Sequence, residues 1–237
     1  MAHKDYDVES LAAYLHLTPM QVSRLANRGK LPGRKIAGEW RFSQGEMHHW
    51  LEARIGLADE EGLVQVEGVL EGAGQSSVAE AVSIAGLLRL EAMAIPLVAR
   101  TRSSVIAAMV GLAAKTCLLW DAGKMEEAVR AREELHPTAL DNGVALLHPR
   151  RPMASILEEP LLALGRTPQG IPFGGQRGSL TDVFFLICSV EDRGHLRVLA
   201  RLSRLIADPS FLAGLRAAPD PRHAHEFIAA AEARLEA

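Results

Sequence analysis

The sequence predicts an α/β domain in its C-terminal part, preceded by a small module of short helices and a hairpin. Apolar runs at 142–148 and 180–190 alternate with segments of helical periodicity, as in a layered domain of strands and helices. Residues 4–55 instead carry short periodic segments separated by Gly-containing turns. A chain of 237 residues is long for one domain and comfortable for two, so the two patterns are assigned to separate domains.

The composition excludes several classes of protein. Hydrophobic residues make up 48% and charged residues 23%, which is typical of a soluble globular protein. No stretch approaches the roughly 20 apolar residues of a membrane-spanning helix, and the first five residues lack the order of a secretory signal. Cys117 and Cys188 both lie in apolar runs, which favours two buried, reduced thiols in a cytoplasmic protein over a disulfide. No cofactor is expected, and no Cys/His spacing indicates a metal site.

Charge is distributed unevenly, although the net charge is only −3. Residues 24–41 contain six basic residues and one acid, which suits contact with phosphate groups. Residues 57–80 contain six acids and no base, which excludes that role for them. The segment 56–80 is also rich in Gly and Ser and indicates a flexible linker. Its loose apolar stripe is compatible with a short helix that supports dimerisation, and it consists of Leu57, Leu63, Val66 and Leu70.

The N-terminal module begins with two helices at helix-turn-helix spacing. Residues 8–15 place apolar side chains at helical intervals. Thr18, Pro19 and Gln21 then form the pattern of a capping box with proline at the first helical position. The second helix ends before Gly29. The tight turn between the two helices is typical of a helix-turn-helix.

A hairpin and a third helix follow. Residues 31–36 and 40–42 flank a Gly-containing turn, which predicts a two-stranded wing. Ser43 then caps a helix that has Glu46 at its third position. The apolar face of this helix is expected to carry Met47, Trp50, Leu51 and Ile55.

The order of these elements resembles the excisionase-type, MerR-like winged helix-turn-helix over residues 4–55. The motifs that carry the resemblance are Ala-Ala-Tyr-Leu at 12–15, Gly-Lys-Leu-Pro at 29–32, Gly-x-Trp-Arg-Phe at 38–42 and Trp-Leu at 50–51. The resemblance implies that the second helix enters the DNA major groove and that the wing contacts phosphate or the minor groove. It implies DNA-binding roles for Gln21, Ser23, Arg24, Asn27, Arg28, Arg34, Lys35 and Arg41, and Arg24 can pair with a guanine edge. The alternative is a small protein-binding domain with solvated charges.

The C-terminal part, residues 81–237, is expected to alternate strands and helices. Helices are predicted over 104–115 with Ser103 or Ser104 as the cap, from Asp121 to about Leu135, over 195–206, from Asp208, and from Asp220 to Leu235. Strands are predicted from the turn at 142–143 to His148 and over 180–190, with 158–164 as a short strand or turn. Residues 166–179 hold four glycines and two prolines and are predicted to form a loop. A solvated helix face is assigned to Arg193, Arg197, Arg201 and Arg204.

Two motifs in this part resemble the enzyme IIA domain of the sugar phosphotransferase system, in its mannitol/fructose and nitrogen-regulatory class. The first is Arg-Glu-Glu-Leu at 132–135 followed by Asn-Gly-Val-Ala-Leu-Leu-His at 142–148. The second is a His-Leu-x-x-Leu-x-x-Leu helix that starts at His195. The resemblance covers about residues 83–235. It implies a mixed sheet flanked by helices, with His148 as the phosphoryl-accepting residue.

The chemistry of this site is assigned to two histidines and an arginine. His148 ends a strand beside a proline, so we expect it to be rigid and still exposed; a neutral imidazole is a competent nucleophile at cell pH. The resemblance implies that His195 lies near the phosphoryl oxygens or orients His148, and that Arg150 supplies fixed positive charge. Main-chain amides at the start of the His195 helix are expected to add anion affinity. Leu147 stands where the family usually has proline, and a purely structural histidine is the alternative.

The resulting hypothesis is a cytoplasmic transcription regulator that also acts as a phosphocarrier. Its expected partners are double-stranded DNA, an HPr-like histidine phosphocarrier as phosphoryl donor and a second copy of the chain, without membrane insertion. One alternative is a transport component that passes phosphate to a sugar-permease IIB domain. Another is a sensor that binds a small anion and controls transcription without forming phosphohistidine.

Overall fold

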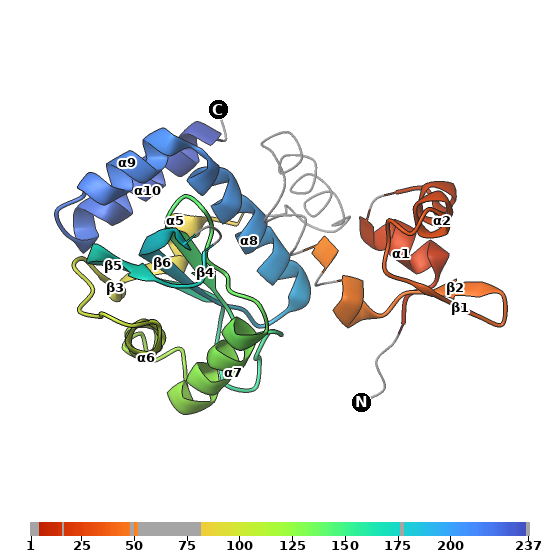
Figure 1. The fold of residues 1–237 in the computed structure, drawn as a ribbon, viewed down its shortest axis with the longest axis horizontal. Helices are drawn as coiled ribbons and strands as arrows, with labels where there is room; N and C mark the ends of the chain where they lie inside the picture. Colours follow the sequence, from red (N-terminus) through yellow and green to blue (C-terminus); the bar gives the residue numbers. More distant parts are fainter. Residues whose placement is uncertain (1–4, 16, 48–49, 52–81, 176–177, 236–237) are drawn as a thin grey trace. The chain divides into compact units, whose positions relative to one another are not determined.

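The computed structural model of the protein describes residues 5–15, 17–47, 50–51, 82–175 and 178–235 (Figure 1). The chain divides into two compact units, residues 1–81 and 82–237. The predicted linker at 56–80, with its apolar stripe, lies outside the described residues. Within the described ranges, no helix is both long enough and apolar enough to cross a membrane.

The N-terminal unit contains the two predicted helices. Helix α1 spans Val8–Leu15 and helix α2 spans Pro19–Asn27. Thr18 caps α2 in the predicted capping box, because its hydroxyl accepts from the Gln21 amide while the Gln21 side chain accepts from the Thr18 amide at 2.8 Å. Two orphan amides at the start of α2 are therefore satisfied, and the start of this helix is fixed by its own sequence.

A hairpin completes this unit. Strands β1 (Arg34–Ile36) and β2 (Glu39–Arg41) pair in antiparallel fashion, as predicted for the wing. Tyr6 and Phe42 exchange main-chain hydrogen bonds of 2.8 and 2.9 Å, so the hairpin is joined to the start of the unit. The buried core consists of Leu11, Ala12, Leu15, Val22, Ala26, Leu31, Phe42, Met47 and Leu51.

The C-terminal unit is built on a four-stranded mixed sheet in the order β3-β5-β6-β4. Its strands are β3 (Leu88–Ala94), β4 (Val144–Leu147), β5 (Leu161–Pro172) and β6 (Leu180–Cys188). β3 runs parallel to β5 and β4 runs parallel to β6, whereas the central pair β5 and β6 is antiparallel. This arrangement confirms the predicted mixed sheet.

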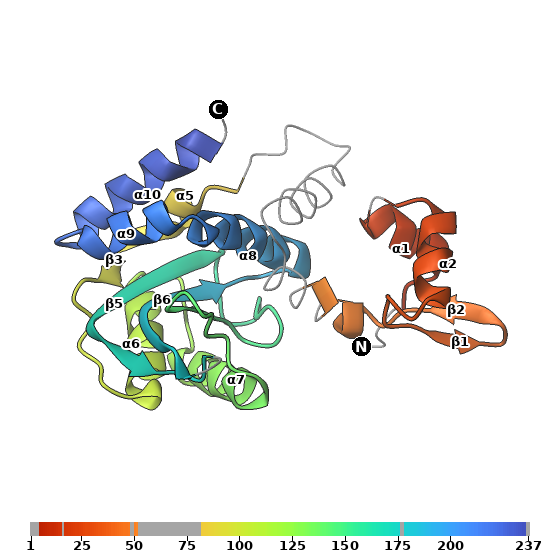
Figure 2. The same ribbon diagram turned by 45° about the horizontal axis from the view of Figure 1, so that its top comes forward.

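Helices cover both faces of this sheet (Figures 1 and 2). One face packs against α6 (Arg102–Ala114) and α7 (Ala122–Leu135). The other face is covered by α5 (Ile84–Leu87), α8 (Asp192–Ala207), α9 (Pro209–Ala217) and α10 (Pro221–Leu235). The core beneath α6 and α7 buries Met109, Val129, Phe184 and Leu186 completely. Hydrophobic burial on both faces thus makes the sheet the rigid centre of the unit.

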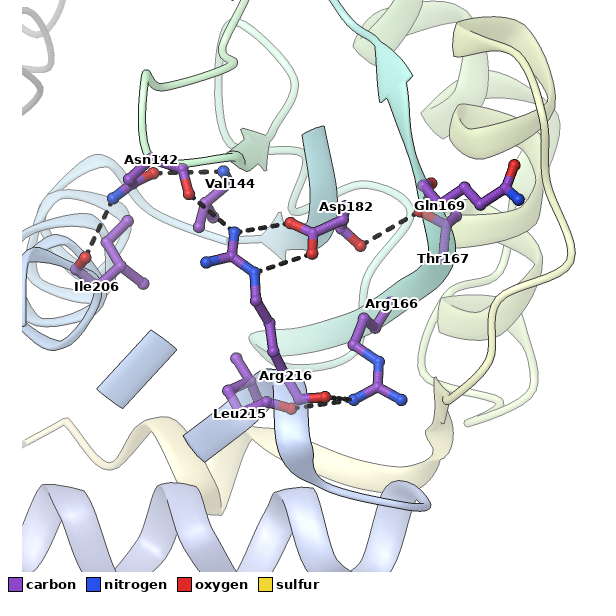
Figure 3. A network of polar contacts seen from close by, with 9 residues as sticks. All are labelled: Asn142, Val144, Arg166, Thr167, Gln169, Asp182, Ile206, Leu215 and Arg216. Atoms are coloured by element: carbon purple, nitrogen blue, oxygen red, sulfur yellow. Dashed lines mark hydrogen bonds and ion pairs between the residues drawn. The ribbon is translucent and has the colours of Figure 1, made fainter. Parts of the chain in front are cut away.

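The turn before β4 is tied to helices on the second face (Figure 3). Gly143 has a φ of +85°, and a Cβ atom added there would lie 2.7 Å from Nη2 of Arg216. Arg216 donates to both carboxylate oxygens of Asp182 on β6 at 2.7 and 2.8 Å, and to the main-chain oxygen of Asn142 at 2.8 Å. The Asn142 side chain donates to the main-chain oxygen of Ile206 in α8 at 3.1 Å. These bonds fix the position at which β4 enters the sheet.

The predicted loop at 166–179 is wrong in its first half. β5 continues to Pro172, because β6 pairs with it at Ile171 and Pro172 after an irregularity in the register that begins at Arg166. The extra residues in β5 form a bulge that accommodates Pro168 and Gly170.

Two smaller predictions about α6 and its surroundings are also wrong. Helix α6 starts at Arg102 because Thr101 is its cap, while Ser104, one of the predicted caps, is the capping-box partner. Cys117 is exposed and not buried, since it lies in the turn after α6 with a φ of +61°. Cys188 is buried as expected, and its burial raises the pKa of the thiol to about 12.

Candidate functional site

The sheet topology brings the two predicted histidines together. His148 directly follows β4, and His195 lies in the first turn of α8. Because β4 and β6 are parallel neighbours, their carboxyl ends meet at the same edge of the sheet, and α8 begins just after β6. The centroids of the His148 and His195 rings lie 5.1 Å apart, and the ring planes are inclined by 52°.

One hydrogen bond fixes the orientation of the His148 ring. Its Nδ1 atom lies 2.8 Å from the main-chain oxygen of Leu146. A carbonyl oxygen can only accept, so in the neutral ring Nδ1 carries the proton and the lone pair is on Nε2. The Leu146 amide, in the preceding peptide group, donates to the main-chain oxygen of Thr138 at 3.3 Å, which holds Leu146 in place.

A buried carboxylate, that of Glu133, accepts hydrogen bonds from Thr138, the residue bonded to the Leu146 amide. Glu133, at the end of α7, is 1% exposed and accepts from the Thr138 amide at 3.1 Å and from the Thr138 hydroxyl. Its other partner is Arg102 on α6, whose Nη2 lies 3.0 Å from Oε2. Burial raises the pKa of the Glu133 carboxyl above its usual value, while Thr138 and Arg102 act in the opposite direction. Glu133 therefore holds the segment to which the Leu146 peptide is bonded.

The second histidine is held by a serine. The Oγ atom of Ser189 lies 3.2 Å from Nδ1 of His195. Helix α8 begins at Asp192, three residues earlier than predicted, so the His195 amide already donates to the main-chain oxygen of Glu191 at 3.1 Å. The prediction that the helix starts at His195 is wrong for this reason, and the first amides of α8 belong to Asp192, Arg193 and Gly194.

The predicted exposure of His148 is also wrong. The His148 side chain is 3% exposed and His195 is 2% exposed. The His148 ring folds back onto its own strand through the bond to Leu146, and the His195 ring of α8 lies against it. Arg150, two residues further on, is at the surface, as is Arg151. Arg177, in the predicted loop at 166–179, lies outside the described residues.

The predicted DNA-binding residues lie mostly on exposed positions of α2 and the hairpin. Ser23 and Arg41 are half-buried, and the exposed members are Gln21, Arg24, Asn27, Arg28, Arg34 and Lys35. Arg24, Asn27 and Arg28 are three and four positions apart, so they share one face of α2 and its C-terminal end.

Several of these side chains already have partners within the N-terminal unit. Arg34 forms an ion pair with Asp5 at 3.0 Å, and Arg41 pairs with Glu39 at 2.9 Å. Contact of these two arginines with phosphate therefore requires them to exchange a carboxylate for a phosphate. The oxygen of the Gln21 side chain is used in the capping box, which leaves its amide nitrogen for an outside partner.

Comparison with known proteins identifies both units. The profile of the family "Phosphoenolpyruvate-dependent sugar phosphotransferase system, EIIA 2" matches residues 87–231, which is more than half of the chain. The chain belongs to this EIIA 2 family. A second profile, "Helix-turn-helix domain", matches residues 6–55. The protein thus joins a helix-turn-helix DNA-binding domain to an EIIA domain.

Individual relatives agree with this assignment. The nitrogen regulatory protein of Bradyrhizobium diazoefficiens is 34% identical over 128 residues, which cover 52% of this chain and 80% of that protein. The structure of IIA-Ntr from Neisseria meningitidis has a TM-score of 0.56 at 21% identity and covers 61% of this chain and 98% of that one. IIA mannitol from Escherichia coli, solved in complex with phosphorylated IIB mannitol, has a TM-score of 0.52 at 19% identity. The match covers 61% of this chain and 99% of that one. The two structures show the EIIA fold.

Two side chains of the EIIA domain support the site, Ser189 by a direct bond to His195 and Glu133 through Thr138, and neither was among the predicted residues. Glu133 belongs to the motif at 132–135, and a carboxylate at the end of an amphipathic helix looks solvent-exposed in the sequence alone. Ser189 is a polar residue near the end of the apolar run 180–190. A polar residue at the end of a buried strand is the feature of the sequence that could have marked it as a candidate site residue. A buried hydroxyl that follows a strand needs a hydrogen-bond partner, and His195 is that partner.

Proposed function

We propose that this protein is a DNA-binding regulator whose EIIA domain accepts a phosphoryl group on Nε2 of His148. The observation that carries the proposal is the His148–His195 pair, with its centroids 5.1 Å apart at the carboxyl end of β4. The hydrogen bond from Nδ1 to Leu146 leaves the lone pair of the neutral ring on Nε2. Membership of the EIIA 2 family supports this reading.

The transfer requires no cofactor beyond a phosphohistidine donor, for which an HPr-like carrier is proposed. The Nε2 lone pair of His148 forms a bond to phosphorus while the donor's N–P bond breaks, and the donor imidazole keeps that electron pair. Arg150 supplies positive charge for the phosphoryl oxygens once the side chains close around the group. Because His148 is 3% exposed, transfer also requires a movement that brings Nε2 to the surface.

Intact-mass measurement after incubation of the full chain with phosphoenolpyruvate, enzyme I and HPr tests this proposal. We expect the wild type to gain the mass of one phosphoryl group and the His148→Ala variant to gain none. His223→Ala is the matched control, because His223 is exposed on α10 and bonds only with Asp220 among the described residues. Equal labelling of wild type and His148→Ala contradicts the assignment of the acceptor.

The burial of both rings favours a second candidate function, a sensor that binds a small anion without covalent transfer. His148 and His195 are 3% and 2% exposed, so a donor protein does not reach them in this conformation. Under this candidate the wild type stays unlabelled in the experiment above. Phosphate-containing small molecules then raise the melting temperature of the wild type and not that of His148→Ala.

For the N-terminal unit we propose that Arg24 on α2 contacts a base edge in the major groove. Arg24→Ala is expected to weaken binding to a DNA site selected from a random pool by about 1–3 kcal/mol, because a bidentate guanine contact is lost. Filter binding over a series of salt concentrations measures this loss, and wild-type affinity is expected to fall steeply with salt. Arg222→Ala, at an exposed position of α10, is the control. Salt-independent binding, or equal affinity of Arg24→Ala and wild type, contradicts the proposal and favours a protein-binding module.

A further inference from the structure

Ser189 lies at the point where β6 passes into the turn before α8. Its side chain is 3% exposed, and its Oγ atom lies 3.2 Å from Nδ1 of His195. Its main-chain oxygen accepts from the Met153 amide at 2.9 Å, so the segment after His148 holds the backbone of Ser189 in place. The hydroxyl is therefore a fixed partner of the His195 ring and not a mobile surface group.

The direction of this hydrogen bond follows from what a buried hydroxyl needs. Among the residues that the structure describes, the Ser189 hydroxyl has no hydrogen-bond partner other than His195. If Nδ1 of His195 carried the proton, the hydroxyl would accept and its own hydrogen would remain buried without an acceptor. If Nε2 carries the proton instead, the hydroxyl donates to the Nδ1 lone pair, and the phosphoryl oxygens of the proposed transfer accept from the Nε2–H, so that both buried donors have acceptors.

We propose that Ser189 donates to Nδ1 of His195 and thereby holds this ring in the tautomer that carries its proton on Nε2. The two adjacent histidines then have opposite tautomers. The carbonyl of Leu146 fixes the proton of His148 on Nδ1, and the hydroxyl of Ser189 fixes that of His195 on Nε2. One ring presents a lone pair and the other presents an N–H donor.

This division of roles between His148 and His195 rests on the proposed phosphoryl transfer, in which each ring has one task. The Nε2 lone pair of His148 takes up the phosphorus atom, and the Nε2–H of His195 donates to a phosphoryl oxygen, where negative charge has to be stabilised. Ser189 does not touch the phosphoryl group in this scheme. It is a positioning residue that acts through the tautomer of His195.

Nitrogen-15 NMR of the histidine rings in the full chain tests the proposal directly. The wild type is measured at about pH 8, where imidazoles of ordinary pKa are neutral. We expect His195 to carry its proton on Nε2 and His148 on Nδ1. In Ser189→Ala we expect His195 to become a mixture of the two tautomers, while His148 is unchanged. Ser189→Thr, which keeps the hydroxyl, is expected to restore the wild-type tautomer of His195.

The rate of labelling by phosphorylated HPr gives a second readout. Ser189→Ala is expected to lower the labelling rate constant at saturating donor roughly fivefold, the factor that corresponds to one hydrogen bond of about 1 kcal/mol, without raising the donor concentration that gives half of this rate. A proton on Nδ1 of His195 in the wild type overturns the proposal, as does an unchanged tautomer in a folded Ser189→Ala variant. If the tautomers are as stated and no label is taken up, the proposed phosphoryl transfer fails and the role of Ser189 stands.

Discussion

Replacement of Glu232 by alanine is expected to lower the free energy of unfolding of the C-terminal unit by about 3–5 kcal/mol. Glu232 on α10 is 5% exposed, and its Oε1 lies 3.0 Å from Nε of Arg201 on α8, which is 4% exposed. The same carboxylate accepts from the amides of Ile84 and Ala85 at 2.6 and 3.1 Å. The substitution therefore removes one acceptor of a buried guanidinium and the side-chain acceptor of two amides at the start of α5.

Hydrogen exchange of the β6 amides in the full chain measures this effect, because these central amides exchange only when the unit opens globally. Glu226→Ala is the matched control, since Glu226 is exposed on the same helix. It is expected to change stability by less than about 0.5 kcal/mol. If Glu232→Ala lowers the free energy of unfolding by less than about 1 kcal/mol, the buried Arg201–Glu232 pair does not contribute substantially to the stability of the unit.

The same pair shows why side-chain partners are hard to predict. The spacing of Arg193, Arg197, Arg201 and Arg204 predicted one solvated face of α8. Arg201 is instead buried, and its guanidinium bonds the carboxylate of Glu232 on α10. Helical periodicity shows which residues share a face, but a segment about 30 positions away decides whether that face is covered.

Local features were predictable where the determining atoms are close in the sequence. The capping box of Thr18 and Gln21 depends on residues three positions apart, and the structure contains it. The proximity of His148 and His195 follows from one motif that ends just after β4 and a second motif in the helix after β6, once β4 and β6 are known to be parallel neighbours. Their burial was not predictable, because it depends on how α8 lies over the strand end.

β5 illustrates how composition can mislead. Glycines and prolines predicted a loop from Arg166 onward, because these residues usually mark turns. Gly170 on β5 serves close packing instead, since a Cβ atom there would lie 2.7 Å from Cβ of Leu180 on β6. The sequence alone does not distinguish a glycine required by a neighbouring strand from one required by a turn.

Glu133 is the second residue at which a large effect is expected. In Glu133→Ala the amide and hydroxyl of Thr138 lose their acceptor, at a cost of about 1–3 kcal/mol for each buried donor left unsatisfied. The main-chain oxygen of Thr138 accepts from the Leu146 amide, and the Leu146 carbonyl accepts from Nδ1 of His148, so the variant should also broaden the His148 ring signals in NMR spectra. Glu134→Ala, at the exposed neighbouring position, is expected neither to lower stability nor to broaden the His148 signals.

Glu133→Gln separates the charge of this residue from its hydrogen bonds. Burial raises the pKa of Glu133 above 4.5, so the folded state binds its proton more tightly than the unfolded state does. The contribution of this group to stability is therefore full below about pH 4.5 and is lost as pH rises through the higher folded pKa. Denaturation at about pH 4 and about pH 7 should show the wild type losing stability relative to Glu133→Gln as pH rises. A relative gain would mean that the ion pair with Arg102 outweighs the desolvation of the carboxylate.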